Sequence, residues 1–196
     1  MLLLSPAKIN LALDIIRRDI LRSDASGFHE IQTVYHEIPE LADSIELKET
    51  PRWITVEFSP NSPVNTAELP KDNRNTAYKA AKAMQEHFKV GSGVEIRIHK
   101  NIPVFSGLGG GSSNAATVMK GLNELWGIHA PQEELIKLSH QISMDAAFFF
   151  YGGTALGAHF GENITPLPPL LLSLPSHIKI EIIDTGVKIS SRDAYA

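Results

Sequence analysis

The chain has 196 residues and contains no cysteine, which excludes disulfide bonds, thiolate metal sites and cysteine nucleophiles. It has no uninterrupted run of the roughly 18 apolar residues that a membrane-spanning helix requires. Its net charge of −4 gives no basic excess, so nucleic acid is not an expected partner. The eight histidines show no metal-ligand spacing. Composition therefore predicts a globular protein without a membrane or nucleic-acid partner, and a cytoplasmic location fits it.

Alternating patterns indicate strands in the first part of the chain. Apolar and polar residues alternate between Ala7 and Asp14, a period of two that is typical of a strand. This period places Lys8 and Asn10 on the same face. The polar segment 17–29 predicts a loop, and the proline-containing segment 59–74 predicts a connection. Further strands are expected at 30–38, 43–48 and 53–58.

Helical periodicity dominates the middle of the chain. Apolar residues recur at helical spacing over 77–88 and again over 115–126, where Gly127 closes the pattern. Pro131 predicts the start of a third helix that runs to about residue 142. Strands are expected at 94–98, 148–159 and 178–184. Strands precede helices without strict alternation, which predicts an α+β fold.

A glycine-rich segment separates the strand at 94–98 from the second helix. Residues 101–116 read NIPVFSGLGGGSSNAA. Glycines allow the backbone to approach a ligand closely, and the N–H groups of the following helical turn favour an anion. Ser112 and Ser113 could cap the helix, donate to phosphate oxygens or bind Mg²⁺. Neither the Walker pattern nor the dinucleotide-binding pattern fits, so we predict a phosphate loop of another kind, with a flexible turn as the alternative.

Two long motifs carry a resemblance to a known family. The segment 103–116 resembles the second motif of the GHMP small-molecule kinases, which include galactokinase, homoserine kinase and mevalonate kinase. The segment SPAKINLAL at 5–13 resembles their first motif. Shorter matches indicate the members that phosphorylate a cytidine diphosphate-linked methylerythritol in non-mevalonate isoprenoid synthesis: Gly27-Phe28-His29, residues 122–126, Asp145 before Phe148-Phe149, residues 152–155 and Gly161-Glu162.

The resemblance implies a fold, two domains and a nucleotide site. Residues 1–163 would form an ATP-binding domain similar to ribosomal protein S5 domain 2. Residues 164–196 would begin a C-terminal α+β substrate-binding domain, with 166–169 as the candidate boundary. The expected ATP-binding residues are Pro103, Gly107, Leu108, Gly109, Gly110, Gly111, Ser112 and Ser113, together with Asn75 and Lys100 near the adenine.

The resemblance also implies catalytic and substrate-binding roles. Asp145 would accept the proton of the 2-hydroxyl of the substrate, and Lys8 would keep Asp145 ionised and neutralise charge at the transferring phosphate. Asn10 would bind the polyol. Mg²⁺ would accompany ATP, with Ser112 or Ser113 as a possible ligand. The expected cytidine-binding residues are Phe28, His29 and Tyr195. From the residues alone, Lys8 could equally be a solvated strand residue and Asp145 a helix cap.

The sequence departs from the family pattern in three places. Residues 19–26 lengthen the loop before Gly27, and Asp145 lies in Ser-Met-Asp-Ala-Ala where the family usually has Gly-Ala before it and Val-Pro after it. The sequence ends at Ala196, whereas the family continues into a C-terminal domain with another glycine-rich segment. For a chain ending here we expect an exposed edge at 178–184, self-association, and weak or no turnover.

Alternative functions remain open at this point. One is another kinase of the same superfamily, acting on homoserine, mevalonate or a sugar. A second is an inactive nucleotide-binding fragment. A third is RNA binding, because the implied fold also occurs in a ribosomal protein. The acidic charge and the glycine loop make this function improbable. For the family assignment we expect a monomer or weak dimer in the cytoplasm of a bacterial-type cell or in a plastid.

Overall fold

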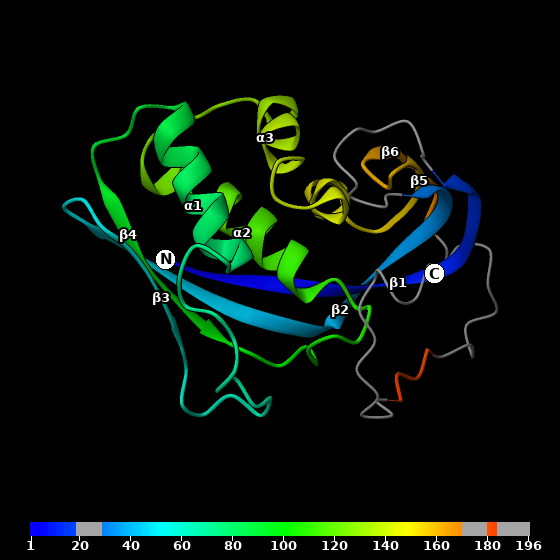
Figure 1. Cartoon of the computed structure of the whole chain (residues 1–196), viewed down its shortest axis with the longest axis horizontal. Coiled ribbons are helices and arrows are strands. Elements are labelled where there is room, and N and C mark those ends of the chain that lie inside the picture. Colours follow the sequence, from blue (N-terminus) through cyan, green and yellow to red (C-terminus); the bar gives the residue numbers. More distant parts are fainter. Residues whose placement is uncertain (19–28, 170–179, 184–196) are drawn as a thin grey trace.

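The computed structural model describes residues 1–18, 29–169 and 180–183. Within these ranges the chain forms six strands and four helices, with one short 3₁₀ helix, η1 (Figure 1). In chain order they are β1 (Leu2–Arg18), β2 (His29–Thr50), β3 (Ile54–Phe58), α1 (Thr76–His87), β4 (Gly93–His99), α2 (Gly110–Leu125), α3 (Gln132–Ser139), η1 (Met144–Ala147), α4 (Phe148–Tyr151), β5 (Thr154–His159) and β6 (Asn163–Pro166). The elements form a mixed α and β architecture, as the sequence predicted.

The long strand β2 organises a six-stranded sheet. β1 pairs with it antiparallel along one edge, from Leu2 opposite Glu46 to Arg18 opposite His29. The other edge is shared: β5 pairs with residues 31–36 and β4 with residues 44–50. β3 adds to β4 in parallel, and β6 adds to β5 antiparallel. The strand that carries Lys8 and Asn10 therefore lies directly beside the central strand β2.

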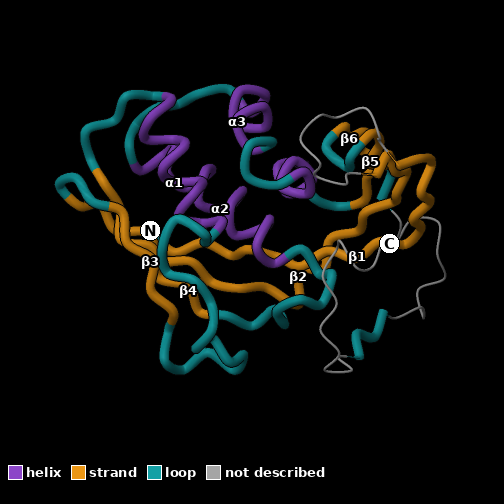
Figure 2. The backbone as a smooth tube through the Cα atoms, in the orientation of Figure 1, coloured by secondary structure: helices purple, strands orange, loops and turns teal. Residues whose placement is uncertain are grey.

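The helices lie on one face of this sheet, as the two views of the backbone show (Figures 1 and 2). The apolar stripe that predicted α1 is buried at Ala77, Ala80, Ala81 and Met84. That of α2 is buried from Ser113 to Met119 and at Leu122. They pack against buried apolar residues of the strands: Ile45, Leu47, Val56, Val94, Ile96 and Ile98. Burying both stripes removes apolar surface from water, which is the main force that fixes α2 and the loop before it.

Two strand predictions were wrong for identifiable reasons. The strands expected at 30–38 and 43–48 are one continuous strand, because Ala7 pairs with Ile38 while the preceding Pro6 pairs with Ala42. The residues between these two partners are accommodated as a β-bulge. The strand expected at 148–159 begins only at Thr154, since 148–151 form α4 with three buried phenylalanines. A short apolar run cannot distinguish a buried strand from a buried helix.

The last part of the described chain also differs from expectation. Residues 180–183 are not in a strand, and the rest of the strand expected at 178–184 lies outside the described residues. Residue 164, the predicted start of the second domain, lies in β6, which belongs to the same sheet. The boundary after residue 163 therefore stays a prediction. Among the described residues, no helix has the length and apolar character to cross a membrane.

Candidate active site at the glycine loop

Lys8 and Asp145 meet beside the glycine loop. The Lys8 side chain is almost buried, and its Nζ lies 3.3 Å from Asp145 Oδ2. Asp145 lies in η1, whose N-cap is Ser143, and it makes no capping bond to α4, whose N-cap is Ala147. Lys8 is thus not a solvated strand residue, and Asp145 is not a helix cap. The predicted pairing is confirmed; the catalytic roles remain predictions.

Asn10 extends this pair along the face of β1. Lys8 Nζ donates to Asn10 Oδ1 at 2.7 Å, so the two side chains share a face as the strand period predicted. Asn10 Nδ2 in turn donates to Thr33 Oγ1 at 2.6 Å. The Thr33 hydroxyl donates to the carbonyl of Ala12 at 2.7 Å. Each partner fixes the next, so a chain of hydrogen bonds that runs from β1 to β2 holds the Lys8 ammonium in one position.

Tyr35 contacts both members of the pair and was not predicted. Its hydroxyl donates to Asp145 Oδ1 at 2.9 Å, and Lys8 Nζ lies 5.3 Å from the centre of its ring. On β2 it follows Ile31 and Thr33 at strand spacing, and all three are buried. The sequence signal was therefore that of an ordinary core residue. Its contact with a carboxylate from η1 joins residues that are 110 positions apart in the sequence, so local patterns could not indicate it.

The glycine loop is attached to β1 immediately beside Lys8. The Lys8 N–H donates to the carbonyl of Leu108 at 3.0 Å, and Leu108 packs in a small apolar cluster with Ala7, Ile38 and Ile102. Gly109 has the left-handed conformation, with φ of 70°, and is the N-cap of α2. No side chain within the described chain makes a capping bond there. The α2 N-terminus can therefore offer N–H groups to an anion next to the lysine ammonium.

Replacing Gly109 by alanine should disrupt this attachment. An added Cβ would lie 2.9 Å from Lys8 Cγ and 3.0 Å from Phe149 Cζ, and φ of 70° strains any L side chain. We expect Gly109→Ala to lower the free energy of unfolding by about 1–2 kcal/mol in urea titrations. The matched control is Gly91→Ala, whose new Cβ meets nothing within 4 Å. Equal effects of the two substitutions would show that the close packing at Gly109 does not matter.

The two serines after the glycines have different surroundings. Neither caps α2, because the N-cap is Gly109 and both serines lie inside the helix, which corrects the predicted capping role. Ser113 is fully buried and its Oγ accepts a hydrogen bond from Ser5 at 2.8 Å. Ser112 is half-buried and its Oγ lies 2.7 Å from Ser143 Oγ, two residues before Asp145. Of the two serines, only Ser112 is not fully buried.

The residues predicted near the adenine already have structural partners. Lys100 is buried, with Nζ 2.5 Å from Asp43 Oδ2. Burial lowers the pKa of the Lys100 ammonium, and the Asp43 carboxylate opposes this change. Asn75 is the N-cap of α1, where its Oδ1 accepts from the Ala77 N–H at 2.8 Å. Pro103 begins the loop, and its carbonyl accepts from Ser106 Oγ at 2.8 Å.

The predicted cytidine site lies mostly beyond the described part of the chain. Phe28 and Tyr195 are outside the described residues. His29 is the first residue of β2 and pairs with Arg18 at the end of β1. The strand therefore places His29 on the continuation of β2 beyond Thr33 and Tyr35, at the far end of the sheet from α1.

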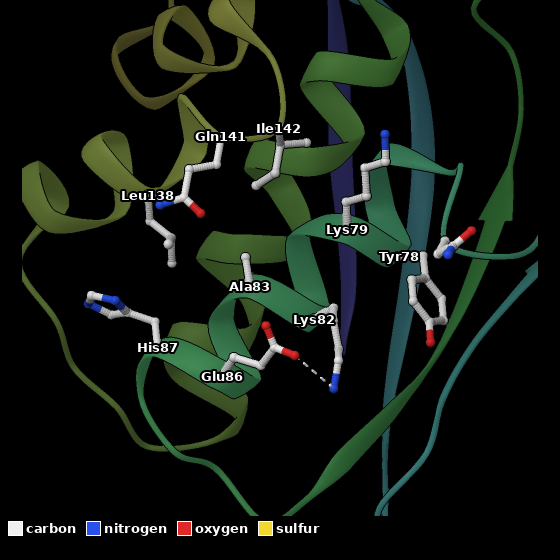
Figure 3. Close-up of a pocket in the computed structure, with 10 residues that line it drawn as sticks. Tyr78, Lys79, Lys82, Ala83, Glu86, His87, Leu138, Gln141 and Ile142 are labelled. Atoms are coloured by element: carbon white, nitrogen blue, oxygen red, sulfur yellow. Dashed lines mark ion pairs between the residues drawn. The ribbon is translucent and has the colours of Figure 1, made fainter.

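A separate cavity of about 470 Å³ lies between α1 and the C-terminal end of α3 (Figure 3). Its lining includes Lys79, Lys82 and His87, but it contains no residue of the Lys8–Asp145 network. In Figure 3 the ammonium groups of Lys79 and Lys82 extend in opposite directions, and Lys82 pairs with Glu86 at 3.1 Å. Its cations therefore do not converge on one ligand. In the described ranges, no three histidine or carboxylate side chains gather to hold a metal ion.

Comparison with known proteins agrees with this geometry. The family model "GHMP kinases N terminal domain" matches residues 75–153, which include α1, β4, the glycine loop and Asp145. The chain is 41% identical over 191 residues to a Bacillus velezensis protein named 4-diphosphocytidyl-2-C-methyl-D-erythritol kinase, covering 97% of this chain and 61% of that protein. It is 44% identical over 195 residues to the Geobacillus sp. protein of the same name, covering 100% of this chain and 62% of the relative.

A solved structure extends the comparison to the fold. The crystal structure of a 4-(cytidine 5'-diphospho)-2C-methyl-D-erythritol kinase superposes with a TM-score of 0.65 at 32% identity, over 85% of this chain and 55% of that one. The chain thus spans about three fifths of the length of the curated relatives it matches. Its described strands and helices, with the Lys8–Asp145 pair beside the glycine loop, have the fold of the GHMP kinase N-terminal domain, whose family model matches residues 75–153.

Proposed function

We propose that the protein is an ATP-dependent kinase that phosphorylates the 2-hydroxyl of 4-diphosphocytidyl-2-C-methyl-D-erythritol. The observation that carries the proposal is the position of Lys8, which pairs with Asp145, directly against Gly109 at the N-terminus of α2. This arrangement places a carboxylate, a cation and an anion-binding helix end at one point. The two similar bacterial proteins named for this activity support the choice of substrate.

The geometry supports a direct transfer. The triphosphate would lie on the loop from Gly107 to Gly111, with N–H groups of the first turn of α2 directed at its oxygens. Asp145, whose side chain is 33% exposed, can reach an acceptor hydroxyl. Its carboxylate would take the hydroxyl proton as the oxygen attacks the γ-phosphorus and the bond to ADP breaks. Lys8 would neutralise charge on the transferred group, and Asn10 would bind the acceptor.

Mg²⁺ would enter together with ATP. Magnesium is commonly held by nucleotide phosphates and water with only one or two protein oxygens, so a preformed cluster of carboxylates is not required. The half-buried Ser112 hydroxyl, beside Ser143 and at the α2 N-terminus, is the protein oxygen that fits such a role. When bound, the ion would supply charge neutralisation at the phosphates. Ser113 is fully buried and hydrogen-bonded to Ser5, so it does not fit.

The remaining proposals concern the binding of the two bases, the cellular location and the partners of the protein. Phe28, His29 and Tyr195 are proposed to bind cytosine, and Lys100 and Asn75 to lie near the adenine. The two relatives described above are bacterial, so they give no support to a plastid location, and we propose the bacterial cytoplasm. The substrate is proposed to be the only required partner, with the protein a monomer or weak dimer.

A coupled ADP-release assay tests the function. We expect weak but measurable turnover with Mg-ATP and 4-diphosphocytidyl-2-C-methyl-D-erythritol, and none above background with homoserine or mevalonate. Turnover with homoserine or mevalonate instead would indicate another GHMP kinase activity and overturn the proposed substrate. ATP-dependent thermal stabilisation without turnover on any acceptor would indicate a nucleotide-binding fragment and overturn the proposal.

A further inference from the structure

We propose that Tyr35 is a positioning residue that fixes the Asp145 carboxylate for proton transfer. This inference rests on the proposed function, in which Asp145 is the base. The tyrosine hydroxyl donates to Oδ1 at 2.9 Å while the Lys8 ammonium lies 3.3 Å from Oδ2. The two contacts come from different strands, β2 and β1, and each engages a different oxygen.

Holding both oxygens restricts the carboxylate more than either contact alone. The terminal torsion of an aspartate is broad, so a carboxylate held at one oxygen can still rotate. With Lys8 on Oδ2 and Tyr35 on Oδ1, the plane of the group is fixed. The side chain nevertheless remains 33% exposed, so an acceptor hydroxyl can reach it. Catalysis gains from such fixed geometry because misplacement of a reacting group by about 1 Å can cost 10²-fold in rate.

Two glycines, Gly157 and Gly161, leave the space that the Tyr35 ring and hydroxyl occupy. A Cβ added at Gly161 would lie 2.5 Å from Tyr35 Oη and 3.5 Å from Asp145 Oδ1. A Cβ added at Gly157 on β5 would lie 2.5 Å from Tyr35 Cε2. The two glycines therefore form a slot that admits the whole ring and its oxygen. The ring itself is 1% exposed and packs 5.1 Å from the ring of Phe148.

The Tyr35 ring without its hydroxyl would pack equally well in this slot. A phenylalanine would keep the contacts of the Tyr35 ring with Phe148 and Gly157, since only the oxygen differs. The hydroxyl adds a polar group to this packing, and it donates to the Asp145 carboxylate. A purely structural role would require only that this buried hydroxyl be hydrogen-bonded. A positioning role requires in addition that the rate of transfer depend on it.

Steady-state kinetics of Tyr35→Phe separate the two roles. We expect kcat to fall roughly 10–100-fold with KM for ATP and acceptor unchanged within about twofold, because binding groups are retained while the base is less well oriented. The matched control is Tyr78→Phe on α1, which removes a hydroxyl outside the network and should leave kcat unchanged. Equal kcat values for the two variants would overturn the positioning role.

A second measurement tests the contact without relying on activity. The chain has four tyrosines, so ¹³Cζ labelling gives four resonances, and Tyr→Phe at positions 78, 151 and 195 assigns Tyr35 by elimination. Asp145→Ala, a change at a partly exposed side chain, should shift the Tyr35 resonance and leave Tyr78 unmoved. An unmoved Tyr35 resonance would refute the contact. Absence of turnover in the unsubstituted protein would instead refute the proposed function, and with it the catalytic meaning of Tyr35.

Discussion

Asp145→Asn is expected to reduce kcat by about 10³-fold in the ADP-release assay, the loss typical of removing a general base. Asparagine keeps the size of the side chain and a carbonyl oxygen that can accept from Tyr35, so the surroundings should persist. What it loses is the charge that pairs with Lys8 at 3.3 Å and the capacity to take a proton. KM for ATP should change little, because the nucleotide contacts are proposed to lie on the glycine loop.

Lys8→Met provides the complementary variant. If the two side chains act as one unit, the double variant should be little slower than either single variant, since effects within such a unit are not additive. Glu134→Gln on α3 is a matched control, because it removes an exposed carboxylate that pairs with His87 at 2.8 Å away from the site. An Asp145→Asn variant that retained more than a tenth of the activity would exclude Asp145 as the base.

Asp43→Asn is expected to destabilise the fold by about 3–5 kcal/mol, the cost of leaving a buried charge without its partner. The side chain of Asp43 is 0% exposed and that of Lys100 is 5% exposed. Asp43 Oδ1 also accepts from the N–H groups of Asn101 at 2.8 Å and Ile102 at 2.9 Å. Asparagine could retain these two bonds, so the loss should reflect the missing charge. Urea unfolding at neutral pH measures it.

The pH dependence of this loss provides an independent check. Burial lowers the pKa of Lys100 below the ordinary 10.5, so between its folded value and 10.5 the unfolded state binds more protons and stability rises with pH. Without Asp43 the folded-state pKa of Lys100 should fall further, so the destabilisation should shrink as pH rises from this lower pKa to the folded-state pKa of the unsubstituted protein. Glu57→Gln is the control: its pair with Lys71 is half-exposed on both sides, and its loss should cost under about 1 kcal/mol. A loss for Asp43→Asn as small as that would show that the buried pair is dispensable.

Loss of the Asp43–Lys100 pair should affect the candidate active site, because Lys100 lies beneath the glycine loop. A Cβ added at Gly110 would lie 2.8 Å from Lys100 Nζ, and Ile102 belongs to the apolar cluster that holds Leu108. Asp43 therefore joins β2, the end of β4 and the loop leading to α2. Lys100, which was predicted to lie near the adenine, has a buried partner in Asp43 that no sequence pattern identifies.

Local elements with periodic patterns could be predicted from the residues alone. Strand alternation around Lys8 placed Asn10 on its face, and the 2.7 Å bond between them confirms it. Helical spacing identified α1 and α2, and the glycines at 107 and 109 have the positive φ that their residue type permits. These features depend on neighbours in the chain, so local rules suffice to predict them. The long motifs also sufficed to indicate the GHMP kinase fold.

Contacts between residues that are distant in the sequence could not be predicted in this way. Periodicity could not show that 148–151 form a helix, because a short apolar run suits either element. Nor could it distinguish Tyr35 from any other buried strand residue, or pair Asp43 with Lys100. Those contacts follow from strand register, in which Tyr35 lies opposite Asn10 and Ala155, and from the packing of η1 against the sheet. Register is set by the burial of whole faces, a property of the assembled sheet that no local segment contains.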